Sequence, residues 1–215
     1  MKQEFLIKEG HSRLLLFFAG WGGEANLFSV YHPVNADYML VSDYRSLCFD
    51  ASLLTAYDEI DVVGWSMGVW MAAHALSGLS LPIRLAWAVN GTPCPIDDRC
   101  GIPEAIFRGT LEGFSPVVLQ KFRRRMCGST AGVKSFLGHQ PVRPLDELRE
   151  ELHSIYKSVT TCLEKPFDWT EAWIGRQDLI FPLENQEVAW QQVKRVYADE
   201  PHYSEWMFHR VLENQ

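Results

Sequence analysis

Short apolar runs alternate with longer amphipathic stretches along the chain. The clearest run is Leu14–Phe18, and further β-rich runs cover residues 38–41, 60–63, 85–89, 169–174 and 193–197. A wholly apolar run fits a strand that is covered on both faces, as in a mostly parallel sheet. Because helical stretches follow most of these runs, the sequence predicts an α/β fold with a doubly wound sheet.

Two segments outside this alternation carry their own predictions. The β-rich runs 4–8 and 13–18 flank Glu9-Gly10-His11-Ser12, a turn composition, and therefore favour an N-terminal hairpin. Residues 50–57 favour a helix that leads into the next strand. Two further helices are expected at 184–192 and from about Ser204 onward.

The region from about 94 to 165 has no convincing strand, and it predicts a small helical lid inserted into a single domain of residues 1–215. Within it, Ser115-Pro116 can cap a helix that ends before Gly128. Apolar side chains share one face of this helix: Val118, Leu119, Phe122 and Met126. Basic side chains share another: Lys121, Arg124 and Arg125.

Composition narrows the possible functions. At 215 residues and 47% hydrophobic content the chain can bury one substantial core, and its net charge of −7 argues against general nucleic-acid binding. Apolar runs are too short to span a membrane and the N-terminus lacks a signal-peptide pattern, so we expect a cytoplasmic protein. Five cysteines without C-x-x-C spacing predict neither a disulfide framework nor a zinc site.

Positive charge is concentrated in the predicted insert. Residues 101–144 carry seven Lys and Arg against two Glu, a net charge of +5 in an acidic protein. A solvated helix face is the simpler interpretation of a single basic helix. A basic insert in an acidic protein nevertheless favours recognition of an acidic partner.

The strongest chemical signal is the G-x-S-x-G pentapeptide Gly64–Gly68. Strand-forming residues lead into it and helix-forming residues follow, a strand, sharp turn and helix arrangement that exposes the hydroxyl of Ser66. The N–H of Met67 would then be unpaired at the start of a helix and could stabilise an oxyanion. The alternative is an ordinary serine N-cap.

Three more residues complete a candidate site. Trp21, in Ala19-Gly20-Trp21-Gly22-Gly23, is the candidate for a second oxyanion N–H, with a plain glycine-rich turn as the alternative. Asp178 follows a late strand and His202 follows the last one, where a carboxylate and the histidine it orients would be placed. Two other acids, Asp43 and Asp61, are interpreted as turn or capping residues.

The order Ser66, Asp178, His202 is typical of α/β-hydrolases. More narrowly, the motifs F-A-G-W-G-G, V-V-G-W-S-M-G and G-R-Q-D-L-I-F-P-x-x-N-Q resemble those of BioG-type pimeloyl-acyl-carrier-protein methyl ester esterases. The resemblance implies that the first motif is the oxyanion loop, the second holds the nucleophile and the third the acid.

The resemblance also implies a function. It predicts a monomeric serine esterase of biotin synthesis that needs no metal or cofactor and acts on an ester presented by acyl carrier protein. Trp65, Lys121, Arg124 and Arg125 are candidates for contact with the substrate or its carrier. Three alternatives stay open: a thioesterase or acyltransferase with the same triad, a generic short-chain esterase, and a non-catalytic binding protein that kept the fold.

Overall fold

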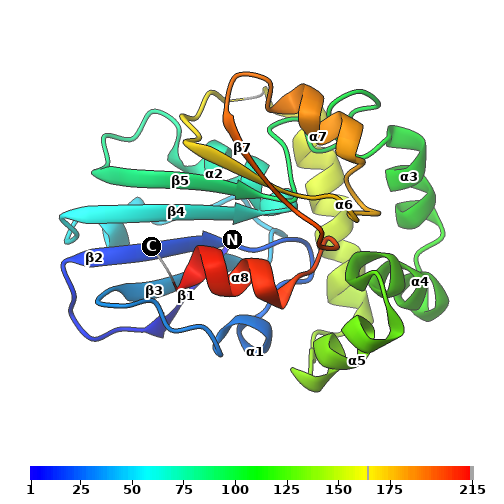
Figure 1. The fold of residues 1–215 in the computed structure, drawn as a ribbon, viewed down its shortest axis with the longest axis horizontal. Coiled ribbons are helices and arrows are strands. Elements are labelled where there is room, and N and C mark those ends of the chain that lie inside the picture. The colour runs from blue at the N-terminus through cyan, green and yellow to red at the C-terminus, as the bar shows by residue number, and fades with distance from the viewer. Residues whose placement is uncertain (164, 214–215) are drawn as a thin grey trace.

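The computed structural model describes residues 1–163 and 165–213 and is built around one seven-stranded sheet (Figure 1). Its strands follow the order β1-β3-β2-β4-β5-β6-β7, and every neighbouring pair is parallel except β1 and β3. The strands are β1 (Lys2–Ile7), β2 (Arg13–Phe18), β3 (Asp37–Ser42), β4 (Glu59–Trp65), β5 (Ile83–Val89), β6 (Glu171–Gly175) and β7 (Lys194–Ala198). The predicted mostly parallel sheet is therefore confirmed.

Helices cover both faces of this sheet. In Figure 1, α8 (Glu205–Leu212) lies in front of the strands and α2 (Met67–Leu76) lies behind them. The all-apolar run Leu14–Phe18 is fully buried between them, which is why it carries no polar position. Three short elements complete these layers: α1 (Ala25–Phe28), the 3₁₀ turn η1 (Ala51–Leu54) and α7 (Leu183–Ala189).

Four helices separate β5 from β6 and lie beyond the ends of the central strands (Figure 1). They are α3 (Glu104–Glu112), α4 (Pro116–Cys127), α5 (Thr130–Gly138) and α6 (Leu145–Thr161). The limits of α4 follow the prediction: Ser115 Oγ accepts the N–H of Val118, and Gly128 ends the helix with a left-handed φ of 69°. Of the predicted insert 94–165, residue 164 lies outside the described residues. Among the described helices, none has the length and apolarity that a bilayer span requires.

The expected N-terminal hairpin is wrong. β1 pairs antiparallel with β3, with Lys2 opposite Ser42, and β3 separates β1 from β2. The turn is present, but Asp37 Oδ1 accepts the N–H groups of its residues 9, 10 and 11 at 2.9, 3.0 and 3.1 Å. This carboxylate at the start of β3 directs the chain past β3, so the two strands lie on opposite sides of it.

Two local expectations also need correction. Segment 50–57 forms only the four-residue turn η1, because the Ser12 carbonyl accepts the N–H of Asp58 at 2.8 Å and draws the chain into β4. Asp61 is neither a turn nor a capping residue: it lies inside β4, fully buried, and pairs with Arg84 and Arg13. Asp43 does occupy a turn, with a φ of 53°.

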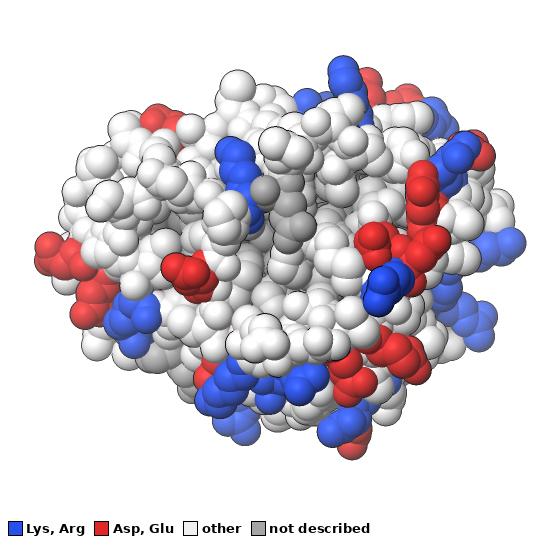
Figure 2. All heavy atoms as spheres, turned by 90° about the horizontal axis from the view of Figure 1, so that it is seen from above, with Lys and Arg blue, Asp and Glu red and all other residues white. Residues whose placement is uncertain are grey.

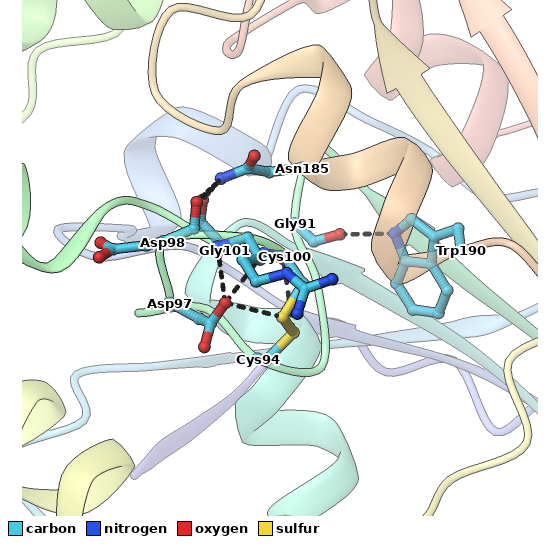
Figure 3. Close-up of a disulfide and its surroundings, with 9 residues drawn as sticks. Gly91, Cys94, Asp97, Asp98, Cys100, Gly101, Asn185 and Trp190 are labelled. Atoms are coloured by element: carbon cyan, nitrogen blue, oxygen red, sulfur yellow. Dashed lines mark hydrogen bonds between the residues drawn. A yellow bond between two sulfur atoms is a disulfide. The ribbon is translucent and has the colours of Figure 1, made fainter.

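The cysteine spacing predicted no disulfide framework, but the structure contains a disulfide bond. Cys94 and Cys100 are joined, in a loop that follows β5 (Figure 3). The loop folds back because Asp97 Oδ1 accepts two N–H groups of residues 99 and 100, at 2.7 and 3.0 Å, and the two Cα atoms are 6.1 Å apart. Asn185 of α7 donates to the Gly101 carbonyl at 2.8 Å and fastens this loop to the neighbouring helix.

Candidate active site

Ser66 occupies a sharp turn between β4 and α2. Its backbone has φ 58° and ψ −126°, a conformation that non-glycine residues rarely adopt. The turn fits because Gly68 has no side chain: a Cβ there would lie 2.0 Å from the Phe18 carbonyl oxygen. The Ser66 side chain makes no cap hydrogen bond, so the ordinary N-cap interpretation does not describe this structure.

The three predicted residues meet in one hydrogen-bonded line. Ser66 Oγ lies 3.0 Å from His202 Nε2, and His202 Nδ1 lies 2.8 Å from Asp178 Oδ2. All three side chains are buried. This arrangement can move a proton from the serine hydroxyl to the imidazole while the carboxylate stabilises the charged ring.

Asp178 is held in a single orientation. Its Oδ1 accepts the N–H groups of Ile180 and Phe181 at 2.7 and 2.9 Å, which leaves Oδ2 for the imidazole. Gln186 donates to that Oδ2 at 3.2 Å. Gln186 was not singled out from the sequence, although it is the last residue of the third motif quoted above.

The His202 loop is fastened to the sheet by two side chains. Asn90 at the end of β5 and the indole of Trp65 at the end of β4 each donate to the His202 carbonyl at 3.0 Å. Asn90 was not singled out from the sequence; it directly follows β5 and has a φ of 44°. Trp65, expected to contact substrate, lines the pocket but is also almost fully buried as a support for the histidine.

Two backbone N–H groups in the segments next to Ser66 are unpaired within the described residues. Within the described residues, neither the Trp21 N–H nor the Met67 N–H has a hydrogen-bond partner. The loop holding Trp21 lies against the serine: a Cβ on Gly20 would be 2.9 Å from Ser66 Cβ. Both N–H groups are thus free to receive a developing oxyanion.

A mostly apolar pocket lies over this site, and its empty space of about 570 Å³ includes the solvent at its mouth. Helices of the insert form its outer wall through Phe107, Phe122 and Leu152. Arg125 of α4 lines this pocket and also an outer groove, which it shares with Lys121 and Arg124. The basic residues predicted to act together are therefore brought together, with Lys121 and Arg124 exposed and Arg125 half-buried.

The charges elsewhere are mixed. Figure 2 looks down on the molecule from the top of Figure 1, and it shows acidic and basic side chains interspersed on that face. Within the described part of the chain, no three His, Cys, Asp or Glu side chains converge in a way that could hold a metal ion.

Comparison with known proteins assigns the family. Residues 1–212 match the family described as pimeloyl-ACP methyl esterase BioG. The chain belongs to this family. The crystal structure of BioG from Haemophilus influenzae superposes with a TM-score of 0.89 at 35% identity, covering 99% of this chain and 100% of that one.

Two further proteins extend the comparison. The malonyl-[acyl-carrier protein] O-methyltransferase of Bacteroides fragilis is 49% identical over 89% of this chain, which spans 39% of that relative's length. A lipase-esterase related protein from Clostridium acetobutylicum matches with a TM-score of 0.64 at 12% identity, over 98% of this chain and 93% of that one. The second likeness concerns the fold alone and, with the BioG match, confirms the predicted α/β-hydrolase fold.

Proposed function

We propose that this protein is a serine carboxylesterase that hydrolyses the methyl ester of pimeloyl-acyl carrier protein, releasing methanol, in biotin biosynthesis. The observation that carries the proposal is the buried line Ser66, His202 and Asp178 beneath an apolar pocket in a BioG family chain. Aliphatic and aromatic walls suit the methylene chain of a dicarboxylic acyl group.

The proposed reaction needs no group beyond the chain and water. His202 Nε2 takes the Ser66 proton as Oγ attacks the ester carbonyl, and the carbonyl oxygen becomes an oxyanion between the N–H groups of Trp21 and Met67. Asp178 stabilises the imidazolium, which then protonates the departing methoxide. Water attacks the acyl-enzyme with His202 again as base, and the free terminal carboxylic acid leaves as its carboxylate.

Acyl carrier protein is the proposed bearer of this substrate, because such carriers are strongly acidic. The outer groove begins where the pocket ends and carries the exposed cations Lys121 and Arg124. In an enzyme of net charge −7, this cluster would attract an acidic carrier to the side of the pocket at which the acyl arm must enter.

One substrate tests the reaction and separates its alternatives. Methyl-pimeloyl carrier protein contains both a methyl ester and a thioester, so mass spectrometry of the carrier shows which bond is cut. Loss of the methyl group alone supports the esterase, whereas release of the whole acyl group identifies a thioesterase or acyltransferase. Ser66→Ala should abolish the reaction and keep the fold. If the wild type turns over no ester at all, the remaining alternative is a non-catalytic binding protein.

A charge-reversal pair tests the carrier. Lys121→Glu with Arg124→Glu should lower kcat/KM for the carrier-bound ester by about tenfold or more at low salt and leave a small free methyl ester unaffected. The matched control is Lys157→Glu with Arg195→Glu, which makes the same charge change at exposed positions outside the groove. Equal losses in both pairs would mean that net charge, and not this groove, governs encounter.

A further inference from the structure

A buried carboxylate from the helical insert lies directly beneath the loop that holds Trp21. Glu151 of α6 is 0% exposed. Its Oε2 accepts the Gly22 N–H at 3.1 Å and its Oε1 accepts the Tyr44 N–H at 3.0 Å. Arg143 completes the set through a 2.6 Å contact between Nη1 and Oε2.

A buried carboxylate destabilises the folded protein unless its oxygens accept hydrogen bonds and its charge is paired. Burial raises the pKa of Glu151, and the Arg143 guanidinium and the two backbone N–H donors act in the opposite direction. Nothing in the proposed chemistry uses this carboxylate, and it does not line the pocket. Its partners are instead backbone groups of two loops, one of which lies against Ser66.

The same helix also holds the side chain next to Gly22. The Trp21 indole N–H donates to the Leu148 carbonyl of α6 at 2.8 Å. Leu148 and Glu151 are one helical turn apart, so α6 fixes the Trp21 ring on one side and the following peptide on the other. The N–H of Trp21 itself, between these two fixed points, has no hydrogen-bond partner within the described residues.

We infer that Glu151 is a positioning residue that sets the second oxyanion donor, so that the insert builds part of the active site as well as covering it. This inference rests on the proposed esterase mechanism. Without both hydrogen bonds to Glu151, the Gly22 peptide relaxes and the Trp21 N–H moves off the position of the oxyanion. Because that charge exists only in the transition state, the loss falls on kcat and leaves KM nearly unchanged.

Glu151→Gln is the direct test. A glutamine fills the same volume, but its single oxygen can accept only one of the two N–H groups, so the link that Glu151 makes between the Gly22 and Tyr44 loops is broken whichever way the amide faces. The exposed neighbour Glu150 provides the matched control, Glu150→Gln. We expect kcat for a small methyl ester to fall by about 10- to 100-fold in Glu151→Gln with KM within about twofold, and no change in the control; loss of a complete oxyanion donor sets the upper limit at about 10²–10³.

A second readout is specific to the oxyanion. The same ester with sulfur in place of the carbonyl oxygen uses N–H donors poorly, so the wild type should prefer the oxygen ester, and Glu151→Gln should show a smaller preference. A purely structural role would lower Tm and leave both kcat and this preference at wild-type values in the folded enzyme, which would overturn the inference.

Measurements on the wild type and on a second variant separate failure of the proposed function from failure of the inference about Glu151. If wild-type enzyme turns over no ester, the proposed function fails; if it does and folded Glu151→Gln matches it, only this inference fails. Should Glu151→Gln not fold, Glu151→Gln with Arg143→Met removes the guanidinium that has lost its Glu151 partner and still leaves one N–H without its acceptor. That folded double variant must show the same reduced preference, and an unchanged preference refutes the positioning role.

Discussion

Replacing Asp178 by asparagine should disable the site while changing only one atom. Oδ1 accepts two backbone N–H groups, so the amide oxygen of the new residue must take that place. Its NH₂ group then faces His202 Nδ1, where Oδ2 now lies at 2.8 Å. The opposite orientation of the amide would place its NH₂ group against the N–H groups of Ile180 and Phe181, which are also donors, so this orientation is disfavoured.

The consequence is the wrong tautomer of the histidine. With a donor facing it, Nδ1 must accept, and the ring proton moves to Nε2, which lies 3.0 Å from Ser66 Oγ. A protonated Nε2 cannot take the serine proton. Where this change has been made in a serine hydrolase triad it lowers kcat by about 10⁴, which corresponds to about 5.5 kcal/mol in the activation barrier.

The assay is kcat for a small methyl ester at saturating substrate, with urea unfolding to show that Asp178→Asn is folded. Asp199→Asn, at an exposed acid that lies outside the hydrogen-bonded line, is the control and should keep wild-type kcat. A folded Asp178→Asn enzyme that loses less than about tenfold would show that Asp178 does not orient the base, and the acid would have to be sought elsewhere.

Three further changes test other parts of the structure. His202→Ala should reduce kcat as much as Ser66→Ala does, whereas His209→Ala, on the exposed face of α8, should be mild; the reverse result moves the base to the last helix. Gly68→Ala should destabilise by about 3 kcal/mol in urea unfolding, because its Cβ meets backbone 2.0 Å away, and wild-type stability would disprove that close packing. Burial raises the pKa of Asp37, but hydrogen bonds from Tyr57 and backbone N–H groups outweigh it and lower the pKa to about 2. Asp37→Asn should therefore cost about 2 kcal/mol at pH 7, and the difference from wild type should shrink as pH falls from about 4 toward 2; a gap that stays constant with pH would contradict this.

Local signals predicted the strands, the Ser66 turn and α4 well, because each depends on neighbours in sequence. The Leu14–Phe18 run can only be a strand buried on both faces, and the glycines around Ser66 allow only one kind of turn. These features give the hydrolase fold and the positions of the candidate residues without any knowledge of distant contacts.

The features that the sequence did not predict depend on contacts between residues that are far apart in the chain. The hairpin is prevented by Asp37, which lies about 27 positions beyond the turn it binds. Glu151 is one of several acids in an amphipathic helix, and nothing in its neighbours distinguishes a buried carboxylate from an exposed one. The disulfide needed the fold of the loop around Asp97, and cysteine counting does not supply it.

The backbone of Ser66 implies a conflict between thermal stability and catalysis. Holding a serine at φ 58° and ψ −126° costs on the order of 1–3 kcal/mol, which the packing around the turn must offset. Glycine adopts positive φ without that cost. Selection of random variants for heat resistance alone should therefore enrich glycine at position 66, whereas selection for ester hydrolysis should eliminate it.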